Sequence, residues 1–214
     1  MSEQEVLARL PWWLSHWLGY RPNGPAKPLP PYLRWAWSFI AAFCGLCVVQ
    51  AIFNYSDYFA SRGVPGIIAS YGASAVLVYC AVESPLAQPR ALVFGHFLSA
   101  LVGVCITKLF SLMPDEAKFK SLRWLAASLS SAVAIVVMDI TETTHPPAGA
   151  TALLPATDDA VWRLSWYYLP VVLLSSALLL VVALIINNIQ RRYPSFWVAP
   201  PKPKQVLPQP NGTK

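Results

Sequence analysis

Two short segments of this sequence combine histidine, hydroxyl side chains and small residues within otherwise apolar surroundings. Residues 70–77 read S-Y-G-A-S-A-V-L and residues 145–154 read H-P-P-A-G-A-T-A-L-L, so that both segments end in G-A-[ST]-A and two aliphatic residues. A proline is tolerated in the first turn of a helix, because its missing N–H would be unpaired there anyway. Pro146 or Pro147 can therefore open a helix just after His145, and the repeated pattern predicts a similar helix start in the first half of the chain.

Helix starts of this kind can bind a small anion without any lysine or arginine. The first-turn N–H groups and the positive end of the helix dipole attract negative charge, and small side chains let a solute approach the backbone. Small residues can also serve only to let membrane helices pack closely, and this alternative stays open. The predicted substrate-binding residues are Ser70, Gly72, Ala73, Ser74, His145, Pro146, Pro147, Gly149, Ala150 and Thr151.

Four ionisable residues lie in or beside apolar segments and are candidates for proton coupling: His96, His145, Asp139 and Glu142. An ionisable group within a membrane span is costly and is therefore often functional. Histidine can gain or lose a proton near neutral pH. Each histidine could instead form a structural hydrogen bond to backbone or a headgroup, and Asp139 could reach water at a helix end.

The composition predicts an all-α integral membrane protein. Hydrophobic residues make up 56% of the chain and charged residues only 12%, whereas soluble proteins have about 25% charged residues. A helix needs about 20 mostly apolar residues to cross a bilayer. The net charge of +6 then reflects cations that flank membrane segments, and we expect no nucleic acid partner. The uncharged runs cover residues 35–56, 63–82, 91–107, 124–138 and 164–190.

These runs, together with the short uncharged segment 143–157, predict six crossings. At 1.5 Å per residue this short segment is about 22 Å long, so it forms a broken or half-length crossing. Each triplet has an odd number of crossings, so the second triplet must run opposite to the first, as a 3+3 inverted repeat with repeat 1 at 35–110 and repeat 2 at 122–189. The six predicted crossings are residues 35–54, 65–83, 91–110, 122–140, 146–156 and 166–189.

The two ends of the chain differ from this central region of residues 33–190. Residues 1–32 predict a tryptophan-rich interfacial helix followed by a proline-rich connector, without the features of a secretory signal. Residues 191–214 predict a cytoplasmic disordered tail, rich in Pro and Lys from residue 199 onward. Cations near both ends place both termini in the cytoplasm by the positive-inside rule, although the basic segment 118–123 would then face outward.

The motifs taken together resemble the HPP family of integral membrane proteins. The resemblance is carried by H-P-P-A-G-A-T-A at 145–152, S-Y-G-A-S-A-V-L at 70–77, S-P-L-A-Q-P-R at 84–90 and Gly95-His96. It implies a small multi-span transporter, with a small monovalent anion such as nitrite as substrate and no cofactor. The tail, R-R-Y-P at 191–194, is similar to that of fungal members.

We therefore expect a membrane transporter or channel for a nitrite-like anion rather than an enzyme. Its expected partners are the anion and the lipid bilayer, and a homo-oligomer would enlarge the pathway that so short a chain can enclose. One alternative is a non-transporting scaffold whose small residues serve packing alone. A less favoured alternative is an intramembrane metalloenzyme built on His96, His145, Asp139 and Glu142, since the sequence lacks a local metal-binding pattern such as H-E-x-x-H.

Overall fold

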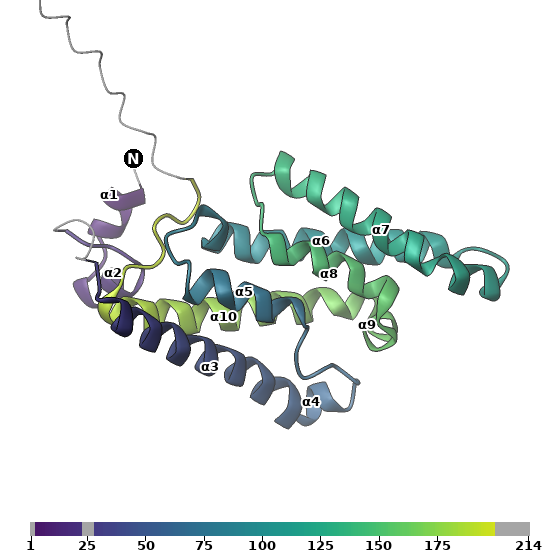
Figure 1. Cartoon of the computed structure of the whole chain (residues 1–214), viewed down its shortest axis with the longest axis horizontal. Helices are drawn as coiled ribbons and strands as arrows, with labels where there is room; N and C mark the ends of the chain where they lie inside the picture. Colours follow the sequence, from purple (N-terminus) through teal and green to yellow (C-terminus); the bar gives the residue numbers. More distant parts are fainter. Residues whose placement is uncertain (1–2, 23–27, 200–214) are drawn as a thin grey trace, which may run out of the picture.

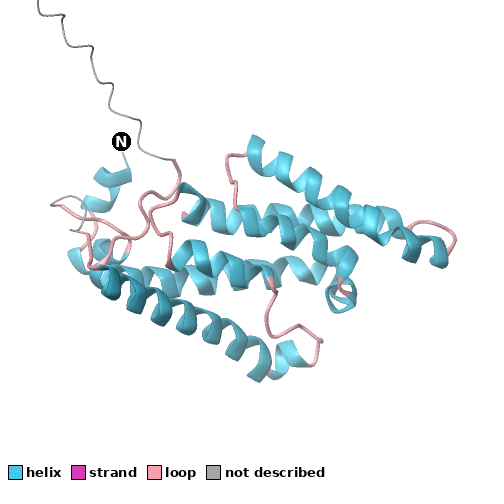
Figure 2. Ribbon diagram, viewed as in Figure 1, coloured by secondary structure: helices cyan, strands magenta, loops and turns pink. Residues whose placement is uncertain are grey.

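The computed structural model describes residues 3–22 and 28–199, and every regular element within them is a helix (Figure 1, Figure 2). The predicted all-helical fold is confirmed for this part of the chain. The elements are α1 (Glu3–Ala8), α2 (Trp12–Trp17), α3 (Pro31–Tyr55), α4 (Asp57–Ala60), α5 (Ser70–Tyr79), η1 (Pro85–Ala87), α6 (Pro89–Ser111), α7 (Glu116–Ile140), α8 (Pro146–Thr157), α9 (Asp159–Leu164), η2 (Ser165–Tyr167) and α10 (Tyr168–Gln190).

Four stretches of helix are long and apolar enough to cross a membrane: α3, α6, α7 and the continuous stretch from α9 to α10. Local sequence explains where they begin. Prolines stand in the first turns of α3 and α6, and the side chain of Asp115 accepts a hydrogen bond of 2.8 Å from Ala117 N at the start of α7. Large apolar side chains such as Phe39 and Ile135 remain more than half exposed, as contact with lipid requires. The chain is an integral membrane protein.

The second and fifth predicted crossings are much shorter than the others. The prediction of a helix over residues 65–83 is wrong in its bounds, because α5 covers only Ser70–Tyr79. Residues 64–69 are not helical, and Gly63 has a φ of +67° in the turn before them. With 10 and 12 residues, α5 and α8 are about 15 and 18 Å long, which is half of a bilayer crossing.

Side chains from the long helices hold the far ends of these two short helices. The carbonyl of Tyr79, at the end of α5, accepts hydrogen bonds of 3.0 Å from Ser38 Oγ on α3 and from Arg191 Nη1. The carbonyl of Ala156, near the end of α8, accepts a hydrogen bond of 2.7 Å from Arg123 Nε on α7. These cations also complement the negative end of each helix dipole.

The two short helices lie side by side and antiparallel, since Ser70 of α5 contacts Thr151 of α8 while Ser74 contacts His145. α6 packs against α8 where two glycines replace side chains. A Cβ atom at Gly95 would lie 2.9 Å from the Cβ of His145, and one at Gly103 would lie 2.5 Å from the carbonyl oxygen of Ala152. The predicted small-residue stripe of α6 thus permits close helix packing.

The described ends of the chain pack together at one end of the helix bundle (Figure 1). The predicted interfacial helix is broken into α1 and α2 around Pro11, and the tryptophans of α2 are exposed. The predicted boundary of a disordered tail at residue 191 does not match the structure, because Tyr193 is fully buried and donates a hydrogen bond of 2.7 Å to Ala87 O. The rest of that predicted tail, residues 200–214, and part of the connector, residues 23–27, lie outside the described residues.

Candidate functional site

A buried cluster of hydroxyl and imidazole side chains lies where the two short helices meet the long helix α6. Its members are Ser70 and Ser74 from α5, His96 from α6, His145 from the residue before α8, and Thr151 from α8. None of the five side chains is more than 5% exposed. All five are sequence-predicted candidates, and the fold brings them together from segments far apart in the chain.

His96 lies at the centre of this cluster. Its Nε2 atom is 2.7 Å from Ser74 Oγ, and its Nδ1 atom is 2.7 Å from Thr151 Oγ1. Ser74 and Thr151 occupy the same place in the repeated G-A-[ST]-A pattern. The two short helices therefore hold opposite edges of one imidazole ring.

His145 joins the cluster to the connector between α5 and α6. Its Nε2 atom is 2.9 Å from Ser74 Oγ, and its Nδ1 atom is 2.8 Å from the carbonyl oxygen of Leu86 in η1. This contact explains the S-P-L-A-Q-P-R segment, because Ser84 Oγ accepts a hydrogen bond from Leu86 N and so shapes the turn that presents the carbonyl. At the other end of the cluster, Ser70 Oγ is 2.7 Å from Thr151 Oγ1.

Two tyrosines that the sequence analysis did not select support the cluster. The ring of Tyr71 stacks on His96 with centroids 4.3 Å apart, and its hydroxyl donates a hydrogen bond of 2.6 Å to Val172 O on α10. Tyr168 donates a hydrogen bond of 3.2 Å to the carbonyl of Thr151. That carbonyl is free because Pro155, four residues later in α8, has no N–H to donate. In the sequence, Pro155 indicates that the carbonyl of Thr151 needs a hydrogen-bond donor from outside α8.

The cluster is polar but contains no fixed charge among the hydrogen-bond partners just described. The two imidazole rings lie in an edge-on arrangement with centroids 4.9 Å apart. Two unit charges at that separation repel by about 3 kcal/mol at an effective dielectric constant of about 20. The pair can therefore carry one proton far more readily than two.

The remaining predicted binding residues surround the cluster without joining it. Ala73, Pro146 and Ala150 are exposed on the outer faces of the two short helices, and a Cβ atom at Gly72 would have no neighbour within 4 Å. Pro147 and Gly149 are buried, and a Cβ atom at Gly149 would lie 3.6 Å from Ser131 Oγ of α7.

The first-turn backbone groups, which the sequence analysis selected as anion donors, are largely occupied. Tyr71 N donates to Ile68 O at 2.9 Å and Gly72 N donates to Ala69 O at 3.1 Å. In α8 the two prolines have no N–H, and Ala148 N donates to His145 O at 2.8 Å. The donors available to a solute at this site are therefore side-chain hydroxyls and imidazoles, with the helix dipoles behind them.

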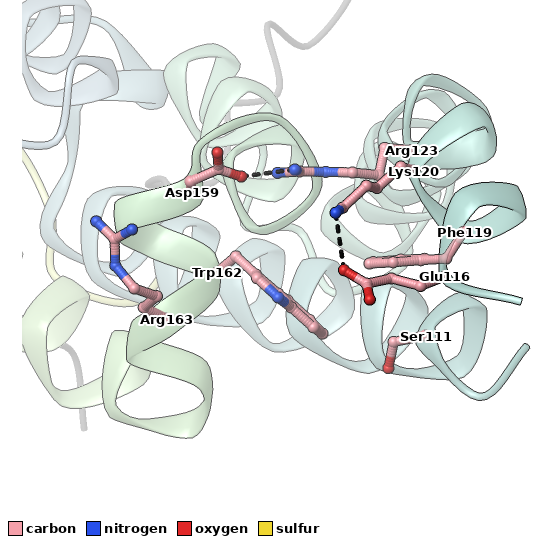
Figure 3. A pocket seen from close by; sticks show the side chains of 8 residues that line it. All are labelled: Ser111, Glu116, Phe119, Lys120, Arg123, Asp159, Trp162 and Arg163. Carbon is pink, nitrogen blue, oxygen red and sulfur yellow. Dashed lines mark hydrogen bonds and ion pairs between the residues drawn. The ribbon is translucent and has the colours of Figure 1, made fainter.

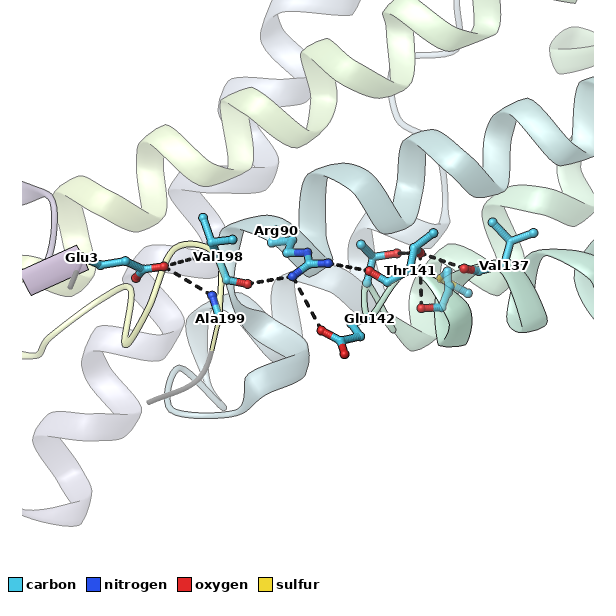
Figure 4. Close-up of polar contacts among 9 residues, drawn as sticks. Glu3, Arg90, Val137, Thr141, Glu142, Val198 and Ala199 are labelled. Carbon is cyan, nitrogen blue, oxygen red and sulfur yellow. Dashed lines mark hydrogen bonds and ion pairs between the residues drawn. The ribbon is translucent and has the colours of Figure 1, made fainter. Parts of the chain in front are cut away.

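The two acidic candidates lie outside the cluster, Asp139 in the last turn of α7 and Glu142 in the turn that follows it, where Figure 4 shows Glu142 beside Arg90. Asp139 is exposed. Glu142 has a φ of +53° and its side chain is 80% exposed, 3.8 Å from Arg90. Arg90 also donates a hydrogen bond of 2.6 Å to Thr141 O. The contacts of Arg90 with Thr141 and Glu142 therefore fix the turn that leads to His145. Within residues 3–22 and 28–199, no three His, Cys, Asp or Glu side chains lie close enough together to hold a metal ion.

A cavity opens at each end of the bundle, and each is lined by the arginine that contacts a short helix. The cavity of about 540 Å³ shown in Figure 3 contains Arg123, which pairs with Asp159 at 2.6 Å, and Lys120, which pairs with Glu116 at 2.8 Å. The cavity of about 830 Å³ at the opposite end is lined by three arginines, Arg34, Arg191 and Arg192. Burial lowers the pKa of Arg191 from its ordinary value.

Comparison with known proteins places this arrangement in a family. Residues 27–194 match the model of the HPP transmembrane region. A transmembrane protein of Dictyostelium discoideum is 37% identical over 190 residues, which cover 86% of this chain and 63% of that protein. A second one is 38% identical over 164 residues, covering 75% of this chain and 50% of that protein, so the chain spans about half to two thirds of the length of these relatives. No solved structure matches the chain. The protein belongs to the HPP family of transmembrane proteins.

Proposed function

We propose that this protein transports a small monovalent anion across the membrane, with nitrite as the substrate that the family resemblance suggests. The observation that carries the proposal is the meeting of two half-length helices at the buried cluster of Ser70, Ser74, His96, His145 and Thr151. Broken helices that meet near the middle of the bilayer form the substrate sites of many secondary transporters. The cluster offers hydrogen-bond donors and no carboxylate, which favours an anion over a cation.

The arrangement of helices supports an inverted repeat of α3–α5–α6 and α7–α8–α10. α3 packs against α5 and α10, as α7 packs against α8 and α6. Tyr79 and Ala156 lie five residues after Ser74 and Thr151, and each of these equivalent carbonyls accepts a hydrogen bond from an arginine. A repeat of this kind gives the transporter two related halves that can rock around one central site.

The cavities at the two ends of the bundle are where an anion would enter from either side, and neither is lined by a residue of the cluster. Each cavity contains an arginine bound to the carbonyl end of a short helix, Arg191 at one end and Arg123 at the other. Positive charge in a cleft raises the local concentration of anions. In the proposed function these arginines attract the anion, and the neutral cluster between them binds it more weakly and lets it leave.

The test is uptake of nitrite into liposomes that contain the purified protein, compared with protein-free liposomes at the same pH. We expect the protein to raise the uptake rate and His96→Ala to return it to the protein-free rate. His16→Ala is the matched control, because His16 contacts Asn188 O at the end of the bundle, away from the cluster. Thr151→Val, which keeps the side-chain shape, provides a second variant in case His96→Ala does not fold.

Wild-type liposomes that take up nitrite no faster than protein-free liposomes would contradict the proposal. A scaffold without transport activity predicts that result. It also predicts that His96→Ala leaves the folded state and assembly of the protein unchanged.

A further inference from the structure

The contacts of the buried cluster allow one arrangement of protons when both histidines are neutral. The carbonyl of Leu86 can only accept a hydrogen bond, so Nδ1 of His145 carries the proton in their 2.8 Å contact. The Nε2 atom of a neutral His145 is then an acceptor. Its 2.9 Å contact with Ser74 requires the Ser74 hydroxyl to donate there, in preference to the longer 3.3 Å contact of that hydroxyl with the carbonyl of Ser70.

The proton positions on His96, Thr151 and Ser70 are fixed by their contacts in the same way. Ser74 has a single hydroxyl proton, so His96 Nε2 must donate in the 2.7 Å contact between them. His96 Nδ1 is then an acceptor, and the Thr151 hydroxyl donates to it at 2.7 Å. Thr151 has no further proton, so Ser70 donates to Thr151 at 2.7 Å.

The result is a chain of hydrogen bonds that all run in one direction, from Ser70 through Thr151, His96 and Ser74 to His145 and the carbonyl of Leu86. Each member donates one proton and accepts one, except that Ser70 receives none within the chain. Chains of this kind polarise along their length, so a change at one end is felt at the other. The oxygen of Ser70 is the place where a proton can enter.

We infer that these five side chains form a proton relay that couples the uptake of one proton to the binding of one monovalent anion at Ser70. The inference rests on the proposed anion transport, and it specifies that proton uptake at the same site drives the binding of the anion. The roles follow from position in the chain of hydrogen bonds: Ser70, whose oxygen accepts from no other member, meets the solute, His145 holds the proton, and the residues between them transfer it.

The transfer can be followed bond by bond, starting from the protonated form of the anion at Ser70. The acid gives its proton to Ser70 Oγ, and Ser70 gives its original proton to Thr151 Oγ1. Thr151 passes its proton to His96 Nδ1, His96 releases the proton on Nε2 to Ser74 Oγ, and Ser74 passes its own to His145 Nε2. Every O–H or N–H bond that breaks is matched by one that forms, and the extra proton ends on His145.

This transfer reverses every hydrogen bond in the chain between Ser70 and His145. Thr151 now donates to Ser70, so the Ser70 hydroxyl is free to donate to the anion that the acid left behind. The anion and the positively charged His145 are thereby held together in one neutral site. The same steps run backward when the anion leaves with its proton, so anion and proton cross the membrane together.

The groups around the imidazole rings of His96 and His145 favour one additional proton on the pair rather than two. Among the described residues, the titratable groups packed around them are Tyr71 of α5 and Tyr168 of α10, and both phenols donate to backbone carbonyls. α7 contributes the uncharged Met138 near Gly95, and the charged residues of the adjoining turn, Arg90 and Glu142, lie next to each other. The 4.9 Å separation of the imidazole rings disfavours a second proton.

The first test is nitrite uptake into proteoliposomes under an imposed pH gradient, with the membrane potential clamped. We expect an inward proton gradient to drive accumulation beyond that in protein-free liposomes, and Ser74→Ala, which breaks the relay at its centre, to reduce it to the protein-free level. Ser175→Ala is the matched control, because Ser175 is fully buried and, among the residues that the structure describes, its hydroxyl bonds only to Val171 O within α10. Nitrite uptake by the wild-type protein that ignores the pH gradient would overturn the relay and leave the proposed transport intact.

The second test observes the protons directly and does not require transport. The chain has only three histidines, so ¹⁵N-histidine labelling gives resolved imidazole signals. We expect the Nδ1–H tautomer for His145 and the Nε2–H tautomer for His96 when both are neutral. His16, whose Nε2 contacts Asn188 O at 2.9 Å, is an internal reference with the Nε2–H tautomer.

Acidification should convert His145 to imidazolium and switch His96 to the Nδ1–H tautomer in the same step. Ser74→Ala should uncouple the two changes. The opposite neutral tautomers, or a His96 tautomer that stays unchanged while His145 is protonated, would overturn the relay whether or not the protein transports nitrite. Absence of nitrite uptake with the expected tautomer switch would instead overturn the proposed substrate.

Discussion

The two short helices carry the same sequence pattern but are held in the protein by different means. α8 begins directly after His145 with two prolines and packs closely against glycines of α6. α5 begins after a non-helical segment and is held through side-chain hydrogen bonds, among them that of Tyr71 to α10. The residues that both helices share, Ser74 and Thr151, are those that contact His96.

This difference separates the parts of the repeat that serve packing from those that serve the site. The close glycine contact at α8 is with backbone, since Gly103 of α6 faces Ala152, whereas the glycine that faces α5, Gly45 of α3, meets the side chain of Tyr79. The hydroxyl in the third position of G-A-[ST]-A is common to both. Substitutions at the close-packed glycines, at the shared hydroxyls and at the helix ends should therefore lower the stability of the protein by different amounts at α5 and at α8.

The largest expected effect is at the contact between α8 and α6. Gly103→Leu would force a side chain into the backbone of Ala152, since even a Cβ atom would lie 2.5 Å from that carbonyl oxygen. Overpacking of this kind costs about 3 kcal/mol or more of the free energy of unfolding. Thermal unfolding in detergent should show the loss, and Gly63→Leu, at a turn glycine with open space around it, tests whether the loss is specific to the helix contact.

A Gly103→Leu protein as stable as the Gly63→Leu protein would contradict the close packing of α8 on α6. Gly63 has a positive φ, which strains any larger residue, so Gly63→Leu is itself destabilised to some extent. The difference in stability between the two variants is therefore a lower limit on the cost of the helix contact.

The next largest effect is expected at the two equivalent hydroxyl groups, those of Ser74 and Thr151. Ser74→Ala leaves nitrogen atoms of both His96 and His145 without a partner, whereas Thr151→Val leaves one nitrogen of His96 and the hydroxyl of Ser70. A buried polar group without a partner costs about 1–3 kcal/mol. Both variants should unfold at lower temperature than the wild-type protein, and Thr151→Ser should restore the stability lost in Thr151→Val. Equal stability of Thr151→Ser and Thr151→Val would show that the hydroxyl contacts do not stabilise the cluster.

A smaller effect is expected at the far ends of the short helices. Arg191→Met removes contacts to Tyr79 O and to Asn187 Oδ1, while Arg123→Met removes one to Ala156 O and an ion pair with the exposed Asp159. Charged hydrogen bonds contribute about 1.5–3 kcal/mol when buried and less when exposed. Thermal unfolding should therefore rank Arg191→Met as the less stable variant, and the reverse order would contradict the greater dependence of α5 on side-chain contacts.

Sequence reasoning identified the helices and the residues of the cluster, but not all of their connections. The lengths of the uncharged apolar runs locate α6 and α10 to within a few residues, and the repeated pattern selects Ser74 and Thr151. The same reasoning grouped Glu142 with the histidines because it lies beside an apolar segment, whereas the turn after α7 directs its side chain to Arg90. Tyr71 and Tyr168 were missed because their partners lie on other helices, and only Pro155 marks one of those partners in the sequence.

The smallest effect is expected at the two glycines that the repeat shares. A Cβ atom at Gly72 would meet nothing within 4 Å, and one at Gly149 would meet only Ser131 Oγ at an ordinary 3.6 Å. Gly72→Ala and Gly149→Ala should not lower the free energy of unfolding, and the higher helix propensity of alanine should raise it by at most about 1 kcal/mol. Both variants should also take up nitrite at the wild-type rate, because neither glycine contacts the cluster. A loss of uptake in Gly72→Ala with unchanged stability would move the anion site from Ser70 to the outer face of α5, and the same result in Gly149→Ala would move it to the contact between α8 and α7.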